Sequence, residues 1–148
     1  MFIYSRNSEN MTLKYPDIMA KIGQVSRSHI TSYVLDCEVV AYHPKDQRIL
    51  PFQILSTRKR KDVSSASIEV EVCLFAFDLL YLNGRSLLEE SFRTRRQLLH
   101  EGFNDVPGEF HFAQFADLTS VDEIQTFLED SLKGAIPSTR DIDHRTLS

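Results

Sequence analysis

Asp36 and Glu38 are the first side chains in this sequence whose type and spacing could support chemistry. They lie two positions apart in an alternating segment, so on a strand they share one face, about 7 Å apart at a rise of roughly 3.3 Å per residue. Such carboxylates are costly to bury alone, and a divalent metal or a sugar hydroxyl would satisfy one of them. Ordinary charges on a solvent-facing strand fit the same spacing, so periodicity leaves both interpretations open.

Phe77 lies in a nearly continuous apolar segment, Cys73 to Leu82, which only Asp78 interrupts. An aromatic residue in such a segment usually belongs to the core. On a rigid strand beside a cleft, the same ring could instead stack on a flat base. Composition does not select between these two interpretations.

Arg58, Lys59, Arg60 and Lys61 form a run of positive charges in a chain whose net charge is −4. Such a run could contact phosphate, which would make binding strongly dependent on salt. Runs of this kind also lie on solvated loops and resemble nuclear-import signals. The negative net charge argues against a protein that is basic all over, but a local patch is enough to steer phosphate.

Predicted strands position the two carboxylates. Alternation predicts a strand over 33–42, and its apolar face is formed by Tyr33, Leu35, Cys37, Val39 and Ala41. A second strand is predicted over 68–82, and its continuous apolar part from residue 73 indicates burial on both faces. A turn is expected at Asn83-Gly84, and 109–115 is predicted as another short strand.

Three predicted helices accompany these strands. A short one lies between Pro16 and Gly23, and a longer one runs from Ser91 to about Phe103, with one apolar side formed by Phe92, Leu99 and Phe103. The last begins with the capping-box pair Ser120 and Glu123 and carries an apolar stripe, Val121, Ile124, Phe127, Leu128 and Leu132. Strands and helices mixed in this order predict an α+β domain.

The composition fits one soluble domain of 148 residues, with 42% hydrophobic and 26% charged residues. No apolar run approaches the roughly 18 residues of a membrane helix. Cys37 and Cys73 lie in strand-like segments without metal-ligand spacing, which favours buried thiols in a reduced, intracellular protein. Residues 135–148 have few large apolar groups and no periodicity, so we expect a disordered tail.

Six segments in this order resemble the ATP-dependent DNA ligases, specifically the eukaryotic DNA ligase I type. They are YSRN (4–7), KYPD (14–17), VLDCEVVA (34–41), PFQILSTRKRK (51–61), VCLFAFDLLYLNG (72–84) and RRQLL (95–99). Each motif alone is weak, but the ordered set is specific and extends over roughly residues 1–133. The resemblance implies a partial nucleotidyltransferase, ATP-grasp-like adenylation domain, with antiparallel sheets and flanking helices.

The resemblance also implies roles for individual residues. Arg6 matches an arginine that contacts the bound nucleotide. Glu38 matches the motif III glutamate, a ribose or metal contact near AMP, and Phe77 matches the motif IIIa aromatic that stacks on adenine. We interpret Asp36 as support for Glu38. The implied cofactors are ATP and Mg²⁺, and the implied partner is nicked double-stranded DNA, in a nuclear protein that is monomeric at full length and serves replication, repair and recombination.

The family's nucleophile is the lysine of a Lys-x-Asp-Gly pattern, and none of the five glycines here follows an aspartate. After Gly134 the motif IV glutamate and the motif V lysines are not found either. We therefore expect residues 1–134 to be a partial adenylation domain, without motif I and motifs IV to VI, that forms no covalent AMP adduct alone.

Two other functions fit the same residues. The chain could be a non-catalytic DNA-binding or regulatory module that keeps the basic run. It could also come from an RNA ligase or an mRNA-capping guanylyltransferase, since these share the fold. The segment 52–61 favours a DNA ligase over these two enzymes.

Overall fold

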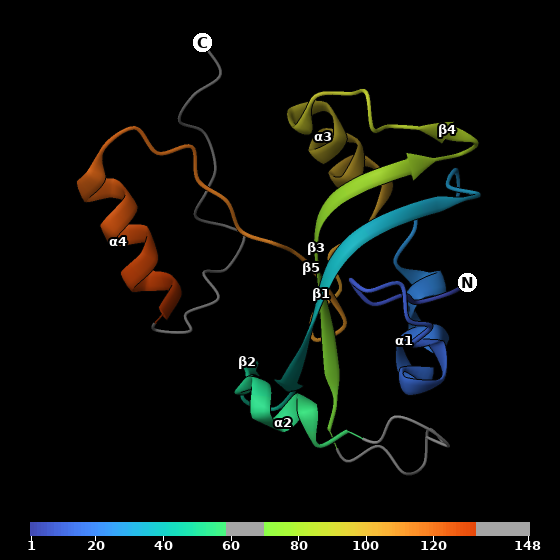
Figure 1. The fold of residues 1–148 in the computed structure, drawn as a ribbon, viewed down its shortest axis with the longest axis horizontal. Helices are drawn as coiled ribbons and strands as arrows, with labels where there is room; N and C mark the ends of the chain where they lie inside the picture. The colour runs from blue at the N-terminus through green and yellow to red at the C-terminus, as the bar shows by residue number, and fades with distance from the viewer. Residues whose placement is uncertain (59–69, 133–148) are drawn as a thin grey trace. The chain divides into compact units, whose positions relative to one another are not determined.

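The computed structural model describes residues 1–58 and 70–132 (Figure 1). The chain divides into two compact units, Met1–Gln114 and Phe115–Ser148. None of the described helices is both long and apolar enough to cross a membrane. The elements in chain order are η1 Thr12–Lys14, α1 Pro16–Lys21, η2 Ile22–Gln24, β1 Tyr33–His43, β2 Arg48–Ile49, α2 Phe52–Ser56, β3 Val72–Leu82, β4 Arg85–Ser86, α3 Phe92–Gly102, β5 Phe110–Phe112 and α4 Val121–Leu132.

The sheet is built around β1 and β3, the two long curved ribbons of Figure 1, which pair antiparallel from Tyr33 to Ala41 of β1. β2 follows on the outer side of β1, and β4 follows β3. Three of the described strand pairs are antiparallel, as expected, and β5 pairs with β3 in parallel, so the sheet is mixed. Parallel pairing needs a crossover connection, and α3 lies in the connection between the two strands. The mixture of elements confirms the predicted α+β class.

The core of the first unit lies on one face of this sheet. β1 contributes the alternating residues that the sequence predicted, with Ala41 at 1% exposure and Tyr33, Leu35, Cys37 and Val39 packed against the core. The helices α1 and α3 and the segment after α1 bury apolar side chains in the same cluster. Its most buried members include Val25, Leu79, Leu87, Leu99, Phe103 and Phe110.

Local sequence signals explain where several elements begin and end. Pro16 opens α1, where a missing backbone N–H costs nothing. Asn83 and Gly84, at φ 47° and 90°, form the tight turn between β3 and β4, as predicted. Ser91 caps α3 by accepting a hydrogen bond from the Thr94 backbone N–H at 3.1 Å.

Two expectations for apolar residues were wrong. Phe92 is 51% exposed, although Arg95 and Arg96 lie over its ring, because α3 turns only its later residues, such as Leu99, to the core. β3 is buried on both faces only at its start, where Val72, Cys73 and Leu74 are at most 8% exposed. Beyond this point one face of β3 is open.

The second unit contains α4, which begins as predicted. Glu123 accepts hydrogen bonds from the backbone N–H groups of Thr119 and Ser120, and its own backbone N–H donates to the Ser120 hydroxyl at 3.3 Å. The predicted apolar stripe is largely exposed within this unit, at 77% for Val121 and 56% for Leu128. The predicted disordered tail, 135–148, lies outside the described residues.

Candidate functional site

A row of side chains crosses the sheet where β1, β3 and β5 are neighbours. Glu38 is directly opposite Phe75, and Phe75 is directly opposite His111. Residues opposite one another in a sheet project from the same face, so these three form one row. The rings of Phe75 and His111 have centroids 5.4 Å apart. The row lies on the face away from the core.

Phe77 reaches this face through a β-bulge in β3. Cys37 is opposite Ala76, and Asp36 is opposite Asp78, so Phe77 has no partner on β1. Ala76 is 1% exposed and points into the core, whereas Phe77 is 38% exposed. The burial of Ala76 and the exposure of Phe77 show that the bulge directs Phe77 away from the core, on the side of the row.

We call Asp36, Glu38, Phe75, Phe77 and His111 the open face. It combines two exposed carboxylates with an outward aromatic ring on a paired, rigid part of the sheet. The structure thus brings together two of the three residues that the sequence assigned to a nucleotide, Glu38 and Phe77. Neither Asp36 nor Glu38 has an ion-pair partner within residues 1–58 and 70–132.

The open face also suits a magnesium ion. No group of three or more His, Cys, Asp or Glu side chains in the described ranges is placed to hold a metal by itself. Mg²⁺, however, usually binds through one or two carboxylates and completes its coordination with substrate phosphates and water. Asp36 and Glu38 offer carboxylates of this kind, because both are exposed and share a face.

Arg6 lies in the N-terminal turn. Backbone hydrogen bonds from Ser5 to Glu9 and from Ser8 to Ser5, both 2.9 Å, close this turn, and Ser8 adopts a φ of 61°. The Arg6 side chain is exposed. Its contact with a nucleotide stays a prediction.

Arg58 is buried, which corrects its assignment as a phosphate contact. Its side chain is 4% exposed, and its Nη1 and Nη2 donate to the Asp17 carboxylate at 3.0 and 2.5 Å. Nε donates to the Lys14 carbonyl at 3.1 Å, and Nη1 also donates to the Val70 carbonyl at 3.2 Å. Four of the five N–H donors of this guanidinium are used inside the protein and the side chain is buried, which leaves it poorly placed to contact DNA phosphate. Lys59, Arg60 and Lys61 lie outside the described residues.

The Arg58–Asp17 pair is completed by Tyr15. The Arg58 guanidinium lies 5.0 Å from the centroid of the Tyr15 ring, which is 6% exposed. Burial raises the pKa of Tyr15, and the positive charge of Arg58 partly offsets this shift. The charges of Asp17 and Glu38 raise the same pKa further, so Glu38 on β1 acts electrostatically on this cluster.

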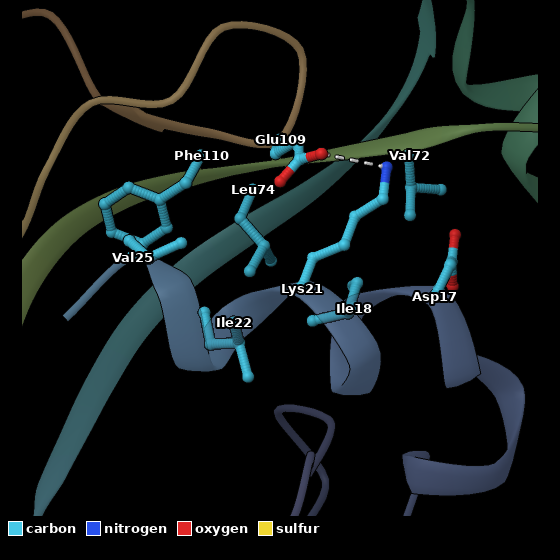
Figure 2. Close-up of a pocket in the computed structure, with 9 residues that line it drawn as sticks. All are labelled: Asp17, Ile18, Lys21, Ile22, Val25, Val72, Leu74, Glu109 and Phe110. Carbon is cyan, nitrogen blue, oxygen red and sulfur yellow. Dashed lines mark ion pairs between the residues drawn. The ribbon is translucent and has the colours of Figure 1, made fainter.

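A small hollow lies between α1 and the sheet (Figure 2). Figure 2 shows Lys21 reaching across it to Glu109, and their charged atoms are 3.2 Å apart. Its volume is about 10 Å³, and apolar side chains such as Ile18, Leu74 and Phe110 line it. That volume holds about one water molecule, so the hollow has no room for a nucleotide.

Two side-chain pairs were not anticipated from the sequence. Asp78 accepts a forked pair of hydrogen bonds from Arg95 of α3, and the only sequence signal was an acidic residue inside an apolar strand. His111 contacts Asp105 through Nδ1 at 2.9 Å, and its Nε2 accepts from the Gly108 backbone N–H at 3.3 Å. Nothing in the residue spacing distinguished His111 in advance.

The cysteines are core residues, as expected. Cys73 is 0% exposed, and Cys37 packs against the core from the inner face of β1. Burial raises the pKa of each thiol to about 12, so both are protonated at neutral pH.

Comparison with known proteins identifies the family. Residues 1–136 match the family described as ATP dependent DNA ligase domain. The chain is 49% identical to DNA ligase 1 of Drosophila melanogaster over 132 residues, which is 89% of the chain and 18% of that protein. It is 48% identical to DNA ligase 1 of Arabidopsis thaliana over 145 residues, 95% of the chain and again 18% of the relative. The chain therefore spans less than a fifth of these relatives.

Solved ligase structures have a similar fold. The ligase domain of M. tuberculosis LigD aligns with a TM-score of 0.54 and 25% identity, covering 76% of this chain and 32% of that one. A mycobacterial DNA ligase D complexed with ATP and MES aligns with a TM-score of 0.53 and 24% identity, covering 76% and 33%. The family match over most of its length and the DNA ligase 1 relatives show that the chain belongs to the ATP-dependent DNA ligase family and resembles the eukaryotic DNA ligase I type.

Proposed function

We propose that the open face is one wall of an adenine-nucleotide pocket in a DNA ligase that seals nicks in double-stranded DNA. The observation that carries this proposal is the placement of Glu38 and Phe77 on one exposed face of the β1–β3 pair. A flat ring beside carboxylates suits a ligand with a flat base at one end and hydroxyls and phosphates at the other.

Each residue has a physical role in this pocket. The ring of Phe77 stacks on adenine, a contact worth about 1–3 kcal/mol per base. The Glu38 carboxylate accepts a hydrogen bond from a ribose hydroxyl or binds Mg²⁺, and Asp36 adds negative charge on the same face. Arg6, exposed in its turn, supplies a guanidinium for the nucleotide. Bound Mg²⁺ would neutralise the charge that develops on phosphate oxygens.

In the family reaction a lysine attacks the α-phosphorus of ATP and pyrophosphate leaves. AMP then passes from the lysine to the 5′-phosphate at a nick, and the 3′-hydroxyl displaces AMP to close the strand. This sequence contains no Lys-x-Asp-Gly pattern. We therefore expect no covalent AMP adduct when the 148-residue chain is incubated with labelled ATP and Mg²⁺. A stable labelled band on the intact chain would contradict this.

Nucleotide binding by the chain tests the proposed pocket directly. Titration with AMP should saturate, and Phe77→Leu and Glu38→Gln should each weaken binding by about fivefold or more, as expected when a stack or a charged hydrogen bond is lost. Phe52→Leu and Glu89→Gln are matched controls, because both residues are exposed and lie outside the open face. If the control variants lose as much AMP affinity as the test variants, Phe77 and Glu38 do not form the proposed pocket.

We propose nicked double-stranded DNA as the partner, and we expect a nuclear protein, monomeric at full length, that is active in replication, repair and recombination. Because Arg58 is buried, the basic run can contact DNA only through Lys59, Arg60 and Lys61. Each phosphate contact contributes a slope of about −0.9 to the dependence of log K on log salt. Replacing these three residues with alanine should flatten the slope in a gel-shift titration, and an unchanged slope would exclude the run as a DNA contact.

A further inference from the structure

The outward position of Phe77 depends on an irregular stretch of β3. Phe77 is the extra residue of the bulge, because the pairing passes directly from Ala76 to Asp78. An unpaired strand residue lacks the ladder contacts that fix its regular neighbours. Phe77 is also 38% exposed, so core packing does not enclose its ring. Other groups must hold this stretch of backbone in place.

Asp78, the next residue, holds the bulge on one side. Its Oδ1 accepts a hydrogen bond from the backbone N–H of Leu79 at 2.8 Å, which ties the side chain to its own strand. Leu79 is 0% exposed and anchors the strand in the core. The same carboxylate is only 13% exposed, so its position is restricted.

Arg95, which lies on α3, holds the Asp78 carboxylate in place. Nε donates to Oδ1 and Nη2 donates to Oδ2 of Asp78, each at 2.8 Å, and Nη1 donates to the Glu90 carbonyl at 2.7 Å. A planar guanidinium in this fork fixes both the position and the orientation of a carboxylate. α3 itself is anchored by Leu99, which is 1% exposed in the core.

We propose that Arg95 is a positioning residue for the nucleotide pocket, which holds the Phe77 bulge through Asp78 so that the ring presents its face to adenine. This inference rests on the proposed function of the open face. In this proposal the effect of Arg95 on nucleotide binding passes through Asp78 and Phe77.

The experiment follows AMP by proton NMR with the full 148-residue chain. A ring stacked on adenine shifts the H2 and H8 protons of AMP upfield, and this signature reports the orientation of the ring. Arg95→Lys keeps the positive charge, but its single nitrogen cannot reproduce the planar fork in which Nε and Nη2 each bind a different oxygen of Asp78. Arg93→Lys is the matched control, an exposed arginine on the same helix.

Arg95→Lys should weaken AMP binding about fivefold, as Phe77→Leu does, and should abolish the upfield shift. Arg93→Lys should leave both unchanged. The double variant Arg95→Lys/Phe77→Leu should bind AMP no more weakly than Phe77→Leu alone, because the two residues act through one contact. Asp78→Asn, which keeps the side-chain volume, should reproduce the loss if Arg95→Lys fails to fold.

The outcomes separate this inference from the proposed function. If Phe77→Leu loses the upfield shift while folded Arg95→Lys or Asp78→Asn keeps it, Arg95 has no positioning role and the pocket stands. Additive losses in the double variant also overturn the inference, because a purely structural effect of Arg95 would be independent of Phe77. If AMP shows no binding to the unmodified chain, the proposed pocket and the inference both fail.

Discussion

Replacing Asp17 with asparagine should strongly destabilise the first unit, because it leaves the buried guanidinium of Arg58 without a counter-charge. Arg58 is 4% exposed and Asp17 17%, so water cannot take the place of the lost carboxylate. Asparagine has one acceptor oxygen where aspartate has two. Its amide therefore turns a donor toward one of the two Arg58 nitrogens now bound at 3.0 and 2.5 Å.

The size of the expected loss in the free energy of unfolding follows from these contacts. Loss of one charge-assisted hydrogen bond costs about 1.5–3 kcal/mol, and breaking a buried ion pair by removing one partner costs about 3–5 kcal/mol. We expect Asp17→Asn to lower the free energy of unfolding by about 3 kcal/mol. In a chain of this size that corresponds to a fall in Tm of roughly 6–12 °C.

Urea unfolding followed by tyrosine fluorescence measures this change, because Tyr15 lies against the Arg58 guanidinium. Asp46→Asn is the matched control, since its pair with Arg48 is more than half exposed at both side chains. An exposed pair contributes about 0–1 kcal/mol. If the two variants lose equal stability, or if Asp17→Asn matches the unmodified chain, the Arg58–Asp17 pair does not stabilise the fold as we infer.

Three further predictions concern turns, thiols and the second unit. Asn83→Ala should lower the free energy of unfolding by about 1–3 kcal/mol in urea titrations, because the Asn83 side chain accepts from Thr31 and donates to the His29 carbonyl. Cys37 and Cys73, whose pKa burial raises to about 12, should react with a thiol reagent at pH 8 only at the rate of unfolding, and fast labelling of folded protein would contradict this. Backbone hydrogen bonds lower the pKa of Glu123 from 4.5, so its support of α4 is present above pH 4.5 and is lost as pH falls through the lowered value. Circular dichroism of Glu123→Gln should therefore show less helix than the unmodified chain at pH 7 and equal helix at low pH.

Local patterns in the sequence were sufficient to predict the structure where the conformation depends on neighbouring residues. The alternation in β1, the turn at Asn83-Gly84 and the capping pair Ser120 and Glu123 were all predicted and are all present. In each of these, a period of two residues or a contact within four positions decides the conformation. The alternation in β1 places Asp36 and Glu38 on one face without any knowledge of the tertiary structure.

The open face as a whole could not be predicted this way, because it depends on how strands pair. Phe77 is exposed as a consequence of a register shift between β1 and β3, and no property of residues 73–82 alone specifies that shift. The row from Glu38 to His111 requires β5 to lie parallel to β3, a pairing set by the crossover through α3.

The burial of Arg58 could not be predicted from the pattern of charges in the sequence either. In sequence it is the first of four equivalent basic residues, and composition treats all four alike. Its partner Asp17 is 41 positions away, and only the fold brings the two together. A buried arginine needs a carboxylate, and a carboxylate in the first turn of α1 is itself favoured by the helix dipole. Asp17 therefore serves both the start of α1 and the burial of Arg58, which is why the basic run divides into one structural residue and three whose predicted role is to contact DNA.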